Sequence, residues 1–198
     1  MAKAINHRER RREIRAAGLR LFARFGFGAV NMGMIAKEVG ISRPLLYTYF
    51  RDKRQLFNEA IDEATNVVAV KYVEVVRSRL PADSKLRQIC ICVFAMLFDN
   101  RDFLCAIVDI LCDYRRDGKT PVENIIRHTV GLRRILHSFI VEAIRRGEYV
   151  RTLNVNRATD LLYSQFETAI LRIAVTGQAE LSAAVDALEA ILIAFRAA

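Results

Sequence analysis

The chain has 198 residues, 53% of them hydrophobic, with no tryptophan, three prolines and a formal net charge of +9. Its longest apolar run, Ile89 to Phe98, is too short to span a bilayer, and no apolar stretch follows the basic start, so we expect a cytoplasmic protein without a membrane segment or signal peptide. Apolar and polar residues alternate nowhere over more than a few positions, which argues against half-buried strands and predicts an all-α fold.

The excess positive charge lies at the N-terminal end of the chain. Residues 1–54 contain thirteen Lys and Arg but only four Asp and Glu, whereas residues 55–198 contain eighteen of each kind. A basic patch confined to one module is typical of proteins that bind a polyanion such as DNA. We therefore expect a DNA-binding domain over residues 1–54 and a second helical domain over residues 55–198.

Residues 31–50 have the spacing of two short helices joined by a tight turn. Asn31 can cap the first helix, and Gly40 can end it, because glycine adopts positive φ at little steric cost. Ser42 can cap the second helix, with Pro44 in its first turn, where a missing N–H is harmless. This pattern is typical of a helix-turn-helix, whose second helix enters the major groove of DNA.

The second of these helices divides into a buried and an exposed face. Leu46 and Phe50 are four residues apart and share the buried face. Arg43, Tyr47 and Thr48 are left pointing outward, toward a DNA groove.

A third helix is expected directly afterwards. Asp52 can cap it, and Gln55 three residues later completes a capping box. Lys53 and Arg54 then lie at a helix N-terminus, an end that attracts anions such as phosphate.

Several spaced motifs in residues 8–60 agree with one known pattern. They are Ala16, Ala17, Leu19, Leu21 and Phe22 with Phe25-Gly26-Phe27, then Ile35-Ala36 with Val39-Gly40-Ile41-Ser42, then Leu46-Tyr47 with Tyr49-Phe50 and Lys53. In these positions the region resembles the DNA-binding domain of the tetracycline-repressor (TetR) family of bacterial transcription regulators. The resemblance implies that Tyr47 and Lys53 contact phosphates. It gives the candidate DNA-binding residues as Asn31, Ser42, Arg43, Pro44, Leu45, Tyr47, Thr48, Tyr49 and Lys53.

Two of these positions depart from the family pattern. Asn31 stands where the family often has threonine, and both residues can cap a helix. Leu45 stands where the family usually has a small or hydroxylic residue, and an apolar side chain there can touch a thymine methyl group.

Beyond residue 60, the residues that can cap or end a helix predict only helices. Pro81 follows the end of a long helix that begins near Lys53, Asn154 and Ser182 can each cap a helix, and Thr120-Pro121-Val122-Glu123 reads as a capping box. The expected later helices are Ser84–Phe98, Arg101–Arg116, residues 121–146, residues 155–176 and residues 183–195.

The same resemblance implies a C-terminal domain that binds a small effector among its middle helices and dimerises through its last two. The residues that can line an effector pocket are Phe94, Phe98, Phe103, Asp109, Tyr114, His128, His137, Tyr163 and Phe166. Each of them can also be ordinary core, and Asp109 can be a salt bridge or an exposed edge. Apolar steps of three and four residues suggest a dimer interface, unless those side chains face their own subunit. They are Leu162, Phe166, Ile170, Val185, Leu188 and Leu192.

Together these features predict a sequence-specific, homodimeric transcriptional regulator, most simply a repressor, that binds an inverted-repeat operator and is released by a small effector. Activation depends on operator position and stays open. The alternatives are a small helical enzyme or redox sensor that uses its cysteines and histidines, and a helical interaction module with a basic N-terminus. No catalytic residue, cofactor or metal site is predicted, because no CxxC, HExxH, Gly-rich phosphate loop or Gly-x-Ser-x-Gly motif occurs.

Overall fold

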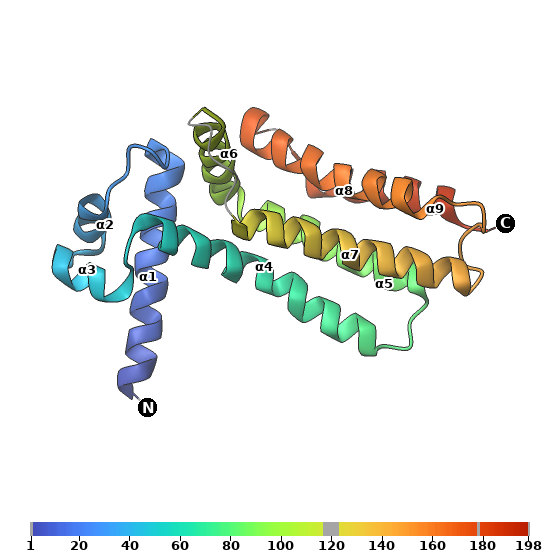
Figure 1. Cartoon of the computed structure of the whole chain (residues 1–198), viewed down its shortest axis with the longest axis horizontal. Coiled ribbons are helices and arrows are strands. Elements are labelled where there is room, and N and C mark those ends of the chain that lie inside the picture. Colours follow the sequence, from blue (N-terminus) through green and yellow to red (C-terminus); the bar gives the residue numbers. More distant parts are fainter. Residues whose placement is uncertain (1, 117–122, 178, 198) are drawn as a thin grey trace. The chain divides into compact units, whose positions relative to one another are not determined.

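The computed structural model describes residues 2–116, 123–177 and 179–197, without the side chains of 2–6, 102, 113–116 and 123–125 (Figure 1). Over this part of the chain the structure is all-helical, which confirms the expected fold class. None of the described helices is long and apolar enough to cross a bilayer. The elements are α1 Ala2–Phe25, α2 Met32–Val39, α3 Arg43–Tyr49, α4 Lys53–Arg77, α5 Ala82–Asp99, α6 Arg101–Arg116, α7 Glu123–Arg145, α8 Val155–Leu171, the π-helical turn η1 Arg172–Thr176, and α9 Leu181–Phe195.

The chain divides into two compact units. The N-terminal unit comprises Met1–Glu63 and Asp102–Asn124, and the C-terminal unit comprises Ala64–Arg101 and Ile125–Ala198. Helix α4 begins in the first unit and ends in the second. These units do not coincide with a division at residue 54, so the functional boundary between 1–54 and 55–198 stays a prediction.

The N-terminal unit has an aromatic core. The Phe27 ring lies 4.9 Å from Phe22 and 5.5 Å from Phe57, and Phe57 lies 5.3 Å from Phe103 (ring centroids). The Phe103 side chain therefore packs in the core of this unit, which agrees with the alternative of ordinary core that the sequence left open. A Cβ on Gly18 would come within 2.8 Å of a Leu56 methyl group, so glycine allows the close approach of α1 and α4.

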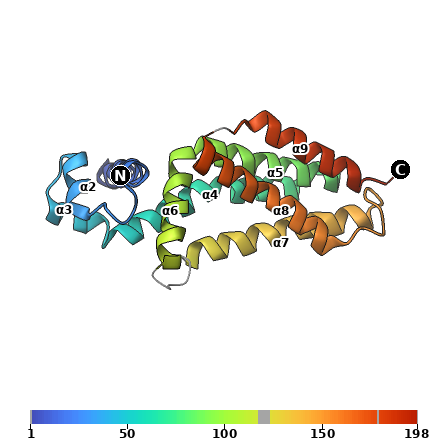
Figure 2. The ribbon, with the colours of Figure 1, turned by 90° about the horizontal axis from the view of Figure 1, so that it is seen from above.

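The core of the C-terminal unit lies where α8 and α9 pack against α5. In Figure 2, α8 and α9 run side by side in opposite directions. Phe94 on α5 meets Phe166 on α8 with ring centroids 4.9 Å apart. Leu162, Phe166, Leu188 and Leu192 are all buried within the chain itself.

This burial corrects the expected dimer interface for those four residues. The three- and four-residue spacing located the apolar faces of the last two helices correctly. It did not reveal that the bulkiest side chains on them face α5 of the same chain. Ile170 and Val185 are half-buried.

The C-terminal end of the chain is fastened to the start of α5. The Tyr149 hydroxyl donates to Asp83 Oδ1 at 2.7 Å, and Arg196 pairs with Asp83 Oδ2 at 2.9 Å. Burial, with the neighbouring Asp83 carboxylate, raises the pKa of the buried Tyr149 hydroxyl. Glu148 accepts from the backbone N–H groups of residues 82 and 83, which satisfies two free donors of the α5 N-terminus.

The expected helix ends agree with the structure except at the starts of α5, which begins at Ala82 and not at Ser84, and of α9. Asn154 caps α8 as expected, and Gly177 takes φ 63° after η1. Ser182 is not a cap, because α9 begins at Leu181 with Glu180 at the N-cap position and no side-chain cap bond. The expected capping box at 120–123 lies outside the described residues.

Candidate nucleic-acid interface

Helices α2 and α3 form the expected helix-turn-helix, and its caps are confirmed. Asn31 Oδ1 accepts from the Met34 N–H at 3.1 Å, and Ser42 Oγ accepts from the Leu45 N–H at 3.3 Å. Gly40 takes φ 71° and ends α2, and the next N–H donates back to Ala36 O at 3.0 Å, as in a Schellman motif.

Helix α3 offers an almost fully exposed surface. Leu46 and the following Phe50 are buried, and they anchor the helix. Arg43, Pro44 and Thr48 are exposed, as are Leu45 and Tyr47, which keep 44% and 43% of their surface. A seven-residue helix seldom exposes two large apolar or aromatic side chains to solvent unless it binds a partner. The exposure of Leu45 and Tyr47 is therefore typical of a binding surface.

The polar side chains of α3 are arranged along this face. Arg43 donates to the Tyr47 hydroxyl at 3.4 Å, with its guanidinium 5.8 Å from the Tyr47 ring centroid. The Thr48 hydroxyl donates to Leu45 O at 2.7 Å, which leaves its lone pairs and methyl group available to a base edge. Tyr49 is half-buried, and its ring stacks on His7 at 4.7 Å.

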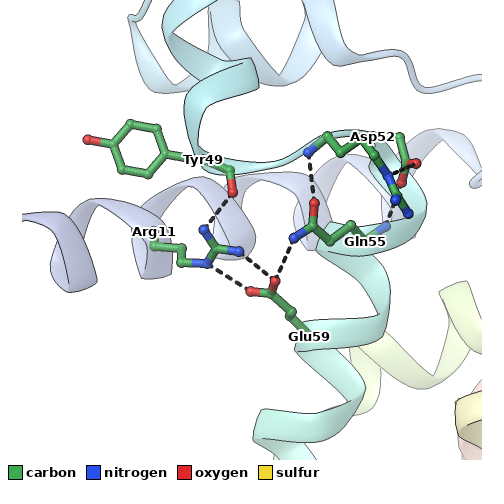
Figure 3. Close-up of polar contacts among 6 residues, drawn as sticks. Arg11, Tyr49, Asp52, Gln55 and Glu59 are labelled. Carbon is green, nitrogen blue, oxygen red and sulfur yellow. Dashed lines mark hydrogen bonds and ion pairs between the residues drawn. The ribbon is translucent and has the colours of Figure 1, made fainter.

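One arginine fixes the C-terminal end of α3 (Figure 3). Arg11 of α1 bonds both carboxylate oxygens of Glu59 on α4, at 2.9 and 2.5 Å, and donates a third bond to Tyr49 O at 2.5 Å. Its guanidinium also lies 4.4 Å from the Phe50 ring centroid. The hydrogen bond to Glu59 raises the pKa of Arg11. Arg11 thus ties three helices together and is not free to contact DNA.

A second ion pair repeats this contact one turn further along α1 and α4. Arg15 is bonded to Glu63, and Arg12 lies 3.5 Å from the same carboxylate. Burial lowers the pKa of the Arg15 guanidinium. These pairs were not predicted, although the sequence carries a signal for them: Arg11 and Arg15 are spaced i,i+4, and so are Glu59 and Glu63.

The corner between α3 and α4 is held by the expected capping residues. Asp52 Oδ1 accepts from the Gln55 N–H at 2.7 Å, and this bond lowers the pKa of Asp52. The Gln55 side chain accepts from the Arg51 N–H at 2.8 Å and donates to Glu59 at 3.1 Å (Figure 3). The cap therefore joins the Arg11–Glu59 pair in one network.

Lys53 has a different environment from the one its resemblance implied. Its ammonium donates to the carbonyl oxygens of Phe27 at 2.6 Å, Val30 at 2.8 Å and Gly28 at 3.1 Å. The same nitrogen lies 4.5 Å from the Phe27 ring centroid. All three ammonium hydrogens are used by the turn between α1 and α2, which favours a turn-fixing role for Lys53 over the phosphate contact that the resemblance implies.

The residues expected at an effector site lie together only in part: Phe94, Tyr163 and Phe166 form one aromatic cluster in the C-terminal unit. Phe94 and Phe98 line a groove in the C-terminal unit. Tyr163 bonds Thr129 at 3.1 Å, and His128 lies 3.4 Å from the Thr65 hydroxyl. His137 is exposed on α7, and Asp109 is exposed in the N-terminal unit, which agrees with its reading as an exposed edge. The Tyr114 side chain lies outside the described residues.

Comparison with known proteins identifies the helix-turn-helix. Residues 14–60 match the model of the bacterial regulatory proteins of the tetR family. Residues 14–60 therefore have the DNA-binding domain of the TetR family of transcriptional regulators. The chain is 31% identical to the HTH-type transcriptional regulator AcrR of Shigella flexneri over 110 residues, which span 54% of this chain and only 51% of AcrR. It is 22% identical to the fatty acid metabolism regulator protein of Bacillus subtilis over 78% of each chain.

Solved structures of TetR-type regulators share the fold along nearly the whole chain. The ketosteroid regulator KstR2 of Mycobacterium tuberculosis aligns over 96% of each chain with a TM-score of 0.75 and 16% identity. A TetR regulator from Haloarcula marismortui aligns over 96% of this chain and 99% of its own, with a TM-score of 0.77 and 18% identity. At these identities the likeness concerns the fold alone.

The geometry at Lys53 gives a prediction that separates a turn-fixing role from phosphate binding. Lys53→Met removes three charge-assisted hydrogen bonds, so we expect a loss of about 2 kcal/mol of unfolding free energy, measured by denaturant titration. The salt dependence of DNA binding should keep its slope, because no phosphate contact is lost. Lys37→Met is the matched control, since the exposed Lys37 makes no described side-chain bond, and it should leave stability unchanged. Unchanged stability of Lys53→Met with a slope reduced by about one per subunit would instead identify Lys53 as a phosphate ligand.

Proposed function

We propose that the chain is a homodimeric repressor that binds an inverted-repeat operator through α3 and is released by a small effector. The observation that carries the proposal is the exposed face of α3, where Arg43, Leu45, Tyr47 and Thr48 stand on a helix anchored by Leu46. Two such helices related by a two-fold axis would read half-sites with centres about 34 Å, or a multiple, apart. An effector that favours a different separation of the two helices would shift the population away from DNA.

We assign no enzymatic step to the chain and place it in the cytoplasm, where its operator is accessible. The family whose model residues 14–60 match is one of transcriptional regulators. The rival hypothesis of a redox sensor depends on the four cysteines, none of which forms a disulfide within the described part of the chain. Burial raises the pKa of Cys90, and that suppresses the reactive thiolate, so this thiol behaves as a small apolar core residue.

The dimer interface that we propose is the outer face of α8, η1 and α9. Leu161, Val175 and Ile193 keep 43%, 71% and 60% of their surface exposed there. Exposed alanines on α9 allow a second helix to approach closely. They are Ala190 and Ala194. The same patch on a second copy would cover this face in a self-complementary contact.

The direct test of the function is selection of bound sequences from random DNA with the full-length chain. We expect an inverted repeat whose half-sites obey the spacing of a two-fold dimer. Binding without any sequence preference would contradict the proposal and favour a merely basic helical module.

Arg43 should determine part of that selected sequence. Its guanidinium can bond guanine at two acceptors, a contact worth ~1–3 kcal/mol of discrimination, so Arg43→Ala should relax preference at one symmetric pair of operator positions. Arg51→Ala is the comparison, because the Arg51 side chain is 84% exposed beyond the end of α3. It should weaken binding to all sequences alike. An unchanged selected motif for Arg43→Ala would mean that Arg43 contacts phosphate only.

The proposed interface predicts different outcomes for exposed and buried residues. Ile193→Glu should give a folded monomer with weakened operator binding, because a charge then lies in the dimer contact. Val70→Glu is the control: Val70 is 61% exposed on α4, and the variant should stay dimeric. Phe166→Glu should unfold the chain, since Phe166 is buried against Phe94. Sedimentation with circular dichroism measures all three, and a dimeric, folded Ile193→Glu would remove this face from the interface.

A further inference from the structure

The C-terminal unit contains a groove of about 720 Å³, a size usual for small-molecule sites. It lies where the end of α5 meets the C-terminal part of α8, the turn η1 and the start of α9. Apolar residues form the floor of the groove, and polar residues form its rim. The rim consists of Arg101, Gln165, Thr168, Arg172 and Glu180.

The rim contains two arginines, Arg101 and Arg172, and one acidic residue, Glu180. Arg101 donates to Ala179 O at 3.0 Å and lies 5.1 Å from the Phe98 ring centroid, so this guanidinium is held over the groove by backbone and ring contacts and not by an acid. Arg172 pairs with no acidic side chain in the described part of the chain. Guanidinium groups without an acidic partner, placed next to apolar surface, favour an anion.

The floor of the groove is apolar and is kept open by small side chains. Phe94 is fully buried and Phe98 nearly so. The remaining apolar lining consists of alanines: Ala169, Ala179, Ala183, Ala184 and Ala187. An apolar floor beneath a cationic rim is complementary to a molecule with one charged end and one hydrocarbon end.

The wall of the groove contains the one break in regular α-helix between residues 155 and 176. Residues 172–176 form a π-helical turn, which Gly177 closes with φ 63°. Such turns are rare and occur often at functional sites, where they alter the placement of side chains along a helix. Here the irregular turn begins at Arg172, the rim residue without an acidic partner.

From this charge pattern we propose that the groove binds a single-chain amphiphile with an anionic head, such as a carboxylate or a phosphate. Arg101 and Arg172 bind the head, and the hydrocarbon chain lies over Phe94, Phe98 and the alanines. The role of the groove as an effector site rests on the proposed function. Binding of the amphiphile to the free protein does not depend on that function.

Calorimetry on the full-length chain tests the site with three decyl probes below their micelle-forming concentrations. Decanoate and decyl phosphate should bind, and decyltrimethylammonium should bind at least about tenfold more weakly, because its head meets two arginines. The two anionic probes separate a preference for carboxylate from one for phosphate. Equal affinity for the cation would overturn the proposal, since the rim would then select no charge.

Two variants locate the site, with circular dichroism to verify folding. Arg172→Gln should weaken decanoate binding about tenfold or more, and Ala183→Leu should weaken it by filling the floor. Arg157→Gln, a loss of an exposed arginine at the start of α8, should leave it unchanged. Unchanged decanoate binding by both Arg172→Gln and Ala183→Leu would overturn the assignment. A monomeric Arg172→Gln would also overturn the assignment, because Arg172 would then belong to the dimer contact and not to an open groove.

Operator binding is measured separately on the same samples. Release of the operator by decanoate supports the effector role, and failure of release with intact decanoate binding overturns that role while the site stands. Absence of any operator binding contradicts the proposed function and leaves the calorimetric result unaffected.

Discussion

The helix that we propose to read DNA, α3, depends on one guanidinium group. Helix α3 is only seven residues long and buries little beyond Leu46, so it cannot be stable alone. Arg11 supplies the missing constraint, because it bonds Tyr49 O at the end of α3 and both oxygens of Glu59 on α4 (Figure 3). This contact leaves the outer face of α3 uncovered and fixes its direction relative to α1 and α4. The DNA recognition that we propose for Arg43 and Tyr47 therefore depends on the contacts that hold the helix beneath them in place.

Much of this unit could be predicted from the sequence, because its signals are local. Caps at Asn31, Ser42 and Asp52, the positive φ of Gly40 and the buried pair Leu46 and Phe50 depend on neighbours within a few residues, and all were correct. The same holds for most helix limits. Ser182 failed as a cap because a competing start one residue earlier, at Leu181, needs no side-chain cap.

The pairings between helices could not be predicted with the same success. A count of basic residues assigns Arg11, Arg15 and Lys53 to the DNA-binding charge, yet Glu59, Glu63 and backbone carbonyls bind them within the unit. Likewise the apolar faces of α8 and α9 were recognised, but not which face meets α5. In each case the partner lies far away in the sequence, and periodicity describes a helix without naming its neighbour. The groove beside Arg172 was missed for the same reason, since it is formed by three separate helices.

The most direct measurement of the central claim is a double-mutant cycle on Arg11 and Glu59, followed in both unfolding free energy and operator affinity. If the pair holds α3 in place, Arg11→Met and Glu59→Gln each reduce both quantities, the double variant costs much less than the sum, and the salt slope of DNA binding stays that of the wild type. A salt slope reduced by about one per subunit in Arg11→Met, with unchanged stability and no coupling to Glu59, would contradict the account. Arg11 would then be a phosphate ligand, and the recognition helix would need another anchor.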